Sequence, residues 1–186
     1  MRYRRDDVVA RAVDVLDRYG LADLTMRRLG AELGVQPSAL YHHFPSKQAL
    51  LAAVADEILA RSTWPGGGSW DARATGICSV LRDSLLAYRD GAEVVATVWS
   101  FGLGAAHPYE ALAGALTEGG LDELAPVAAR TLLHFVYGHA VDEQTHLQAA
   151  SVGAIDDEPR ESSDFETGLG LVMAGIQLAR AVRQAG

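Results

Sequence analysis

The chain has 186 residues, of which 49% are hydrophobic and 22% are charged, and its formal net charge is −8. This composition excludes a disordered or fibrous protein, and the single cysteine, Cys78, excludes an intramolecular disulfide and fits a reducing compartment. No apolar run reaches the roughly 20 residues of a membrane span, and the opening MRYRRDDVV is not a signal peptide, so we expect a soluble, cytoplasmic protein without a membrane partner.

Apolar residues recur at helical spacing along most of the chain, and no stretch keeps the period of two that a half-buried strand requires. We therefore predict an all-α fold of about eight to ten helices. A Gly-rich loop over 62–69 and an acidic loop over 156–164 separate groups of helices. In chain order, the predicted helices cover about 6–20, 26–33, 37–43, 47–61, 70–88, 92–103, 108–118, 124–150 and 165–183.

The charge is distributed unevenly along the chain. Residues 1–48 contain eight Arg or Lys and six Asp or Glu, whereas residues 49–186 contain eight and eighteen. Five of the first 18 residues are arginine. A basic N-terminal part on an acidic body is typical of a protein of which only that part approaches a polyanion.

Residues 25–43 contain two short predicted helices that are separated by Gly34-Val35-Gln36. Two helices joined by a tight turn of this kind form a helix-turn-helix unit, whose second helix fits the major groove of DNA. The candidate contact residues in and just after this segment are small, polar, aromatic or basic, and none of them is an acidic residue that would repel phosphate. The candidates for DNA contact are Thr25, Arg27, Arg28, Gln36, Ser38, Tyr41, His42, His43 and Lys47.

The run from Leu24 to Leu51 resembles the DNA-binding segment of TetR-family transcriptional regulators. The shared features are Thr-x-Arg at the second helix, Gly-Val before the turn, and Leu-Tyr-x-His-Phe-x-x-Lys after it. The resemblance implies that Arg27 or Arg28 reaches a base or a phosphate. It also implies phosphate contacts for Tyr41, His43 and Lys47, and groove-facing positions for Gln36, Pro37, Ser38, Ala39 and His42.

This resemblance implies a ligand-responsive transcriptional regulator, a repressor that binds a palindromic operator in double-stranded DNA as a homodimer. A small-molecule effector would release it, although the sequence leaves activation open as an alternative. We expect residues 1–48 to form a three-helix DNA-binding head and a helix over 47–61 to connect it to the rest. Residues 62–186 would then form a larger helical body for ligand binding and dimerisation.

The last predicted helix is the candidate for the dimer contact, because small and apolar residues form a stripe along it. A flat stripe of this kind allows two helices to approach closely, and a two-fold dimer would supply two heads to one operator. The alternative is that the stripe belongs to the core of one subunit. The interface candidates are Leu169, Val172, Ile176 and Ala179.

The body weakly resembles tetracycline repressors in two segments, 89–94 and 142–146. The positions of their metal-ligating histidine and of two polar drug contacts fall near Val95, Ile77 and Leu81, which have no donor atoms. We therefore expect that architecture with a different effector. An apolar cavity with a few polar groups is the usual small-molecule site, and the candidates for lining it are Trp99, Phe101, His107, His134, Phe135 and His139.

One arrangement favours a different class, a helical metal-carboxylate enzyme. His139, Glu143 and His146 share one helix face, and Glu143 and His146 have the Glu-x-x-His spacing of carboxylate-bridged di-iron bundles. Such a bundle needs a second Glu-x-x-His segment, and the sequence has none. We therefore expect no catalytic residue, no metal and no cofactor.

Overall fold

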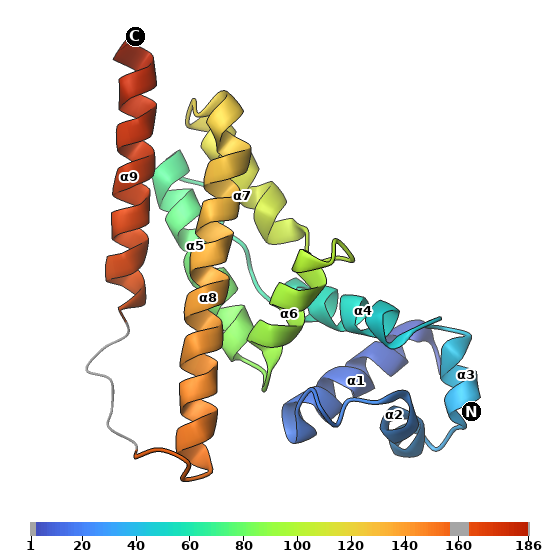
Figure 1. Cartoon of the computed structure of the whole chain (residues 1–186). Helices are drawn as coiled ribbons and strands as arrows, with labels where there is room; N and C mark the ends of the chain where they lie inside the picture. Colours follow the sequence, from blue (N-terminus) through green and yellow to red (C-terminus); the bar gives the residue numbers. More distant parts are fainter. Residues whose placement is uncertain (1–2, 157–163, 186) are drawn as a thin grey trace. The chain divides into compact units, whose positions relative to one another are not determined.

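The computed structural model describes residues 3–156 and 164–185, and within these ranges it contains helices and no strand (Figure 1). The predicted all-α fold is therefore confirmed. The helices are α1 (Arg5–Tyr19), α2 (Met26–Leu33), α3 (Pro37–Tyr41), α4 (Lys47–Ala60), α5 (Trp70–Leu86), α6 (Gly91–Ser100), α7 (His107–Glu118), α8 (Ala125–Ser151) and α9 (Phe165–Ala185), with a 3-10 turn, η1 (Asp122–Leu124), before α8. Most of the predicted acidic loop lies outside the described residues.

The helices group into two compact units. The head unit comprises residues 1–63 and 83–106, and the body unit comprises residues 64–82 and 107–186. Helix α5 contributes its last turn to the head unit and the rest to the body unit, while α6 belongs entirely to the head unit. The predicted boundary at residue 48 divides the chain at one point of its sequence. The two units instead group residues that pack together in space, so each unit contains two segments of the chain. None of the described helices is long and apolar enough to cross a membrane.

In the head unit, the ends of the short helices are fixed by local hydrogen bonds. The Arg28 amide donates to the Thr25 hydroxyl at 3.1 Å, and the Ala49 amide donates to the Ser46 hydroxyl at the same distance, so both helices begin at capped positions. Apolar side chains of α1, α2, α3 and α4 and of the turns between these helices form the core of residues 1–63. Its largest fully buried members are Leu16, Leu24, Leu29, Leu40, Phe44, Leu50 and Ile58.

Gly30 sets the distance between α2 and α3. A Cβ atom at this position would lie 2.8 Å from the Val35 carbonyl oxygen, which is closer than real Cβ contacts come. The chain therefore turns directly against the back of α2, and this close approach lets α3 start only three residues after Gly34. The helix-turn-helix geometry depends on a glycine at residue 30 as well as on the glycine in the turn.

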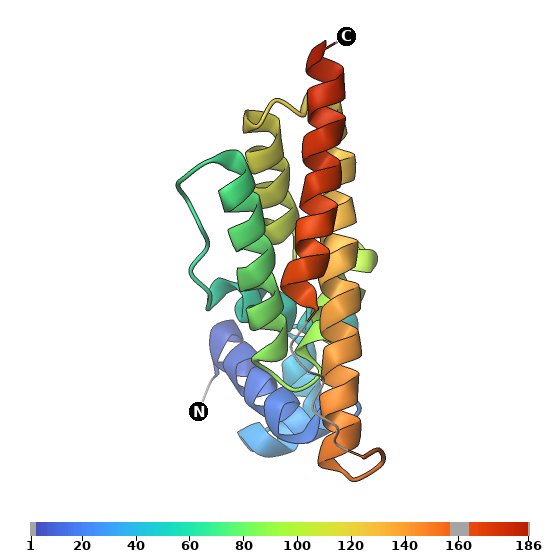
Figure 2. The same ribbon diagram turned by 90° about the vertical axis from the view of Figure 1, so that its left-hand side faces the viewer.

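In the body unit, α8 and α9 run side by side, as both views show (Figures 1 and 2). Helix α9 buries one face, made by Phe165, Leu169, Met173 and Ile176. Helix α8 also packs against α7. The core of this unit is apolar, and its fully buried residues include Ile77, Leu81, Leu112, Leu116, Leu132, Leu133 and Val136.

Candidate nucleic-acid interface and effector region

The α2–α3 segment presents its polar residues outward and its apolar residues inward. Leu40 is buried and anchors α3, whereas the neighbouring Tyr41 is 51% exposed although it is a large aromatic residue. A half-exposed tyrosine beside a helix end can place its hydroxyl on a phosphate. Among the predicted contact residues of this segment, Gln36, Ser38, Tyr41 and His42 are exposed, and Pro37, Ala39, His43 and Lys47 are partly buried.

The two adjacent arginines of α2 have different environments. The Arg28 guanidinium lies 3.7 Å from the centre of the Tyr19 ring, and its Nη1 donates to Asp23 Oδ1 at 3.0 Å. Arg27 is exposed. Cation–π stacking and an ion pair hold Arg28 against the head unit, so Arg27 is the arginine of the two whose side chain is left exposed.

Thr25 combines two possible roles. Its side-chain oxygen accepts the Arg28 amide as the N-cap of α2. The hydroxyl hydrogen still remains available for donation to a phosphate oxygen.

A groove of about 560 Å³ lies next to this surface between α1 and α3. Its lining residues are Tyr3, Val8, Val35, Ala39, Leu40, His42 and His43.

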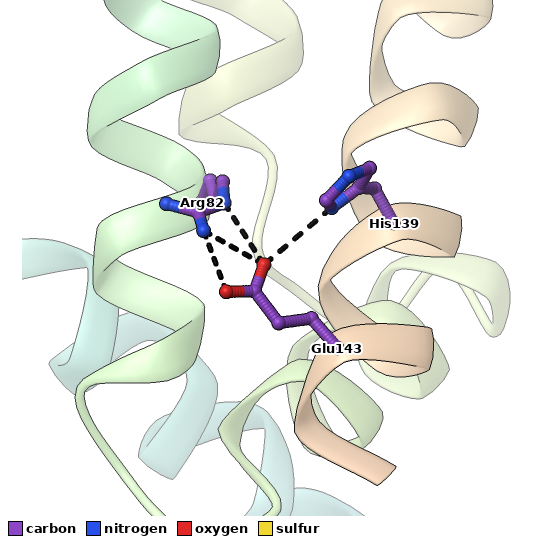
Figure 3. Close-up of polar contacts among 3 residues, drawn as sticks. All are labelled: Arg82, His139 and Glu143. Carbon is purple, nitrogen blue, oxygen red and sulfur yellow. Dashed lines mark hydrogen bonds and ion pairs between the residues drawn. The ribbon is translucent and has the colours of Figure 1, made fainter. Parts of the chain in front are cut away.

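In the body unit, a polar cluster joins α5 to α8. Arg82 donates to Glu143 through Nη2 at 2.6 Å and 2.7 Å to the two carboxylate oxygens and through Nε at 3.1 Å to Oε2 (Figure 3). His139, one turn away on α8, places Nδ1 3.5 Å from the same carboxylate. Phe165, at the start of α9, lies under the Arg82 guanidinium at 5.2 Å. Arg82 and Phe165 are not among the residues predicted from the sequence, because no local pattern pairs residues as far apart as Arg82 and Glu143, which are 61 positions apart.

The predicted pocket residues do not form one group. Phe135 and His139 are close, with ring centres 5.9 Å apart, and both contact Phe165. His107 instead contacts the Trp64 ring at 4.9 Å. Phe101 is 65% exposed, His107 and His134 are also exposed, and Trp99 is partly buried. The candidates for an effector site are thus reduced to the part of the body unit around Phe135 and His139.

Two buried groups of the body unit have raised pKa values. Burial raises the pKa of the Cys78 thiol to about 12, because the thiolate would lose its hydration. Burial also raises the pKa of the Tyr137 phenol, and its hydroxyl has no hydrogen-bond partner among the described residues. Cys78 is therefore an inert core thiol, and Tyr137 is a buried polar group that a ligand atom could satisfy.

An apolar groove of about 370 Å³ lies between η1, α8 and α9. Along α9 the exposed apolar residues are Leu171 at 73%, Leu178 at 67% and Val182 at 65%. Of the predicted interface residues, Val172, Ile176 and Ala179 line this groove, but Ile176 is only 9% exposed and Leu169 only 2%. Leu169 and Ile176 therefore bury most of their surface within the subunit, and the face available to a partner is centred on Leu171 and Leu178.

The capped α2 helix, the tight turn and the outward-facing polar residues of α3 define a helix-turn-helix DNA-binding protein. A family described as "Bacterial regulatory proteins, tetR family" matches residues 8–54, and "Tetracyclin repressor-like, C-terminal domain" matches residues 64–163. The chain belongs to the TetR family of bacterial regulatory proteins. The predicted family is confirmed.

Individual relatives match over nearly the whole chain. The class A tetracycline repressor protein from transposon 1721 of Escherichia coli is 31% identical over 94% of this chain and 91% of its own length. The crystal structure of Mycobacterium smegmatis BioQ is 41% identical over 94% of this chain and 97% of that chain, with a TM-score of 0.86. The chain in a structure of BioQ with its double-stranded DNA operator is 39% identical to this one. The match covers 94% of this chain and 98% of that chain, with a TM-score of 0.80.

Proposed function

We propose that this protein is a homodimeric transcriptional repressor that binds a palindromic operator through its head unit and leaves it when a small molecule binds. The observation that carries the proposal is the outward-facing surface of α2 and α3, where Leu40 is buried and the other residues of α3 are exposed or partly exposed. BioQ, which is similar over nearly the full chain, has been solved on its operator. One head makes few contacts, so tight binding requires two.

The proposed contacts fall into two kinds. Thr25, Tyr41, His43 and Lys47 hold phosphates and so position the head, without reading sequence. Arg27 and the α3 residues face base edges in the major groove, where the donor and acceptor pattern is distinct for each base pair. The proposed base-reading residues are Arg27, Gln36, Pro37, Ser38, Ala39 and His42.

The test begins with a selection of duplexes from a random-sequence library by the wild-type protein, followed by anisotropy titrations with the selected duplex. We expect a palindromic site bound by a dimer. If the two heads contact about 6–10 phosphates, affinity should fall by roughly 10³–10⁵ between 50 and 200 mM salt. Failure to enrich any sequence, or a nearly flat salt dependence, would contradict the proposal.

The apolar groove between η1, α8 and α9 is the surface that we propose for contact with a second copy of this chain. The exposed leucines and valine of α9 form an apolar surface on a helix that already buries its other face. Exposed apolar faces of this extent mark protein–protein contacts, and a closed two-fold pairing matches a palindromic operator. We therefore propose that α9, together with α8, forms the dimer interface.

The effector is proposed to be a small molecule other than a tetracycline–magnesium complex. Val95, Ile77 and Leu81 are each no more than 1% exposed, so these positions form apolar core. A chelate needs oxygen or imidazole donors around its metal. The aromatic rings and polar groups around Phe135 and His139 are the proposed site of effector binding.

We also propose that the protein has no enzymatic activity. The alternative metal-carboxylate site at His139, Glu143 and His146 requires Glu143 to ligate a cation, whereas the Arg82 guanidinium occupies both of its oxygens. Among the described residues, no group of three or more His, Cys, Asp or Glu is arranged to hold a metal ion. Measurement of metal content after purification without chelators tests this, since a stoichiometric metal would support the alternative.

A further inference from the structure

Helix α9 is joined to α5 near both of its ends. The two helices lie beside each other (Figures 1 and 2). Near the start of α9, the Phe165 ring centre lies 5.2 Å from the guanidinium carbon of Arg82, which belongs to α5. Near the end of α9 the roles are reversed, because the guanidinium carbon of Arg180 lies 5.5 Å from the ring centre of Trp70, the first residue of α5. A cation–π contact therefore connects the two helices at each end.

Arg180 also binds the end of α7. Its Nε donates to the carbonyl of Gly119, the residue that follows the last residue of α7. In the turn after α7, backbone amides bind the Leu116 and Thr117 carbonyls, so the turn satisfies those two groups locally. The Gly119 carbonyl instead accepts a hydrogen bond from another helix, and a cation at this position is favoured by the negative end of the helix dipole. Arg180 thus links α9 to α7 as well as to α5.

Gly119 lies directly against the Trp70 ring. A Cβ atom at residue 119 would lie 2.6 Å from Trp70 Cδ2, which is closer than real Cβ contacts come. The Arg73 side chain of α5 also pairs with Glu118 at the end of α7. The start of α5, the end of α7 and the last part of α9 therefore meet at Trp70, Gly119 and Arg180, which we call the three-helix joint.

The three-helix joint contacts the face of α9 that is turned away from its exposed leucines. At about 100° per residue, Arg180 lies on the same side of α9 as Phe165, whereas Leu171 and Leu178 lie on the opposite side. The buried apolar residues of α9 stabilise it without a preferred direction, since burial of apolar surface is non-directional. A cation–π contact and a hydrogen bond each require a particular geometry. The joint therefore fixes the rotation of α9 about its axis.

We propose that Arg180 and Trp70 are positioning residues for dimerisation, which fix the rotation of α9 so that its exposed leucines face the second subunit. This inference rests on the proposed dimer interface and adds the residues that set its geometry. Neither residue lines the apolar groove between η1, α8 and α9. In a two-fold dimer both subunits contribute the same surface, so an error in the rotation of α9 occurs twice in one interface.

The test measures the dimer dissociation constant of matched variants by sedimentation equilibrium. Arg180→Met and Trp70→Leu keep an apolar side chain but remove the cation or the ring. Arg180→Lys and Trp70→Phe retain a cation or a ring. Arg183→Met removes another arginine of α9, which is exposed, and is the control. We expect the dissociation constant to rise about tenfold, or roughly 1.4 kcal/mol, for the first pair and by less than about threefold for the other three variants.

A double-mutant cycle tests whether the two residues act as one unit. If they position α9 through their mutual contact, the protein with both Arg180→Met and Trp70→Leu should dimerise about as well as either single variant, because the second substitution has no contact left to remove. Two independent packing defects would instead raise the dissociation constant about a hundredfold together, and this result would contradict the proposal.

A second measurement reports the rotation of α9 directly. In a Cys78→Ala background, a nitroxide label on Ala181→Cys, an exposed position of α9, gives the distance between the two labels of a dimer by pulsed electron resonance. We expect one narrow distance distribution with the joint intact. In Arg180→Met and in Trp70→Leu the distribution should be broader or displaced, at protein concentrations that keep the variant dimeric. Reduced stability alone would lower the amount of folded dimer and leave the distances unchanged.

The outcomes separate this inference from the proposed function. If the wild-type protein dimerises and both Arg180→Met and Trp70→Leu dimerise within about twofold of it, the joint does not position α9. Unchanged label distances would overturn the inference as well, and either variant suffices for this measurement if the other fails to fold. If the wild-type protein remains a monomer at micromolar concentrations, the proposed dimer itself fails.

Discussion

At the scale of single residues, Arg27 and Arg28 are adjacent in sequence but have different partners. Arg28 stacks on Tyr19 and pairs with Asp23, so it stabilises the head unit. Arg27, in the first turn of α2, is exposed. Neighbouring residues of a helix point about 100° apart around its axis. The position of the Tyr19 ring therefore determines which of the two arginines packs against the head unit and which stays exposed.

We predict that Arg27→Ala and Arg28→Ala affect different quantities. Arg27→Ala should weaken binding to the selected duplex by roughly 1–3 kcal/mol, the cost of losing a base or phosphate contact, with the melting temperature unchanged. Arg28→Ala should lower the melting temperature by a few degrees, since an exposed cation–π contact contributes about 0.5–1 kcal/mol. Anisotropy titration and thermal melting of both variants give the comparison, and the reverse pattern would assign the contact to Arg28.

A second prediction at this scale concerns Cys78, whose pKa burial raises to about 12. Between the ordinary thiol pKa and this value, the unfolded chain loses a proton that the folded chain keeps. The free energy of unfolding should therefore fall as pH rises through this window, by at most about 1.4 kcal/mol per pH unit. Chemical unfolding measured between pH 8 and 11 should show that the free energy of unfolding decreases less for Cys78→Ala than for the wild-type protein.

Thiol labelling gives an independent check on the same residue. Because the thiol is fully buried and protonated, a disulfide reagent at pH 8 should react with the folded protein orders of magnitude more slowly than with the chain in guanidinium. Rapid stoichiometric labelling of the folded protein would show that Cys78 is accessible.

At the scale of helices, α9 has two apolar faces with different roles. One face, which includes Leu169 and Ile176, is buried against its own subunit, whereas Leu171 and Leu178 on another face are mostly exposed. A stripe of apolar residues in a sequence does not state which part of it the subunit itself covers. The structure makes this distinction, so the substitutions that test the dimer belong at Leu171 and Leu178 rather than at the predicted interface residues Leu169 and Ile176.

We predict that Leu178→Arg dissociates the dimer and abolishes tight operator binding while the head unit stays folded. Two arginines that face each other across a two-fold axis would be buried like charges without partners, which costs several kcal/mol. Sedimentation velocity and a titration with the selected duplex measure the two effects. Gln184→Arg, an exposed residue on another face of α9, is the matched control and should remain dimeric. A Leu178→Arg protein that stays dimeric would place the interface on another helix.

At the scale of the whole molecule, the relation to tetracycline repressors is one of family and architecture, and we propose that the ligand-binding residues differ. The class A repressor is similar over nearly the full length of the chain. The positions at which a chelated drug would need donors are buried Val95, Ile77 and Leu81. We therefore propose that the fold and the DNA-binding segment are shared while the effector differs.

We predict that the operator complex stays intact in the presence of tetracycline and magnesium. This should hold at drug concentrations up to about 100 times a micromolar dissociation constant. A ligand shifts the equilibrium only by its difference in affinity for the two states, and a site without donors provides no such difference. A class A tetracycline repressor on its own operator serves as the positive control in the same assay. Release of this protein at micromolar drug would show that other side chains supply the donors.

The sequence by itself determined the helical fold, the order of the helices and the helix-turn-helix segment. These follow from local physics: the 3.6-residue period of apolar side chains, the caps Thr25 and Ser46, and glycines where the chain must turn or approach closely. Local signals of this kind act within a few residues, so they are readable without knowledge of the rest of the chain.

Only the tertiary structure decided which side chains meet across long separations. Arg82 pairs with Glu143, and Arg28 rather than Arg27 stacks on Tyr19. Asp56 accepts the Ala105 amide and Asp90 accepts the Leu21 amide. None of these contacts can be predicted from the sequence neighbours of the residues involved. Burial decided the two faces of α9 in the same way. The physical reason is that these contacts depend on how helices pack, and packing depends on the shape of every neighbouring side chain rather than on any local pattern.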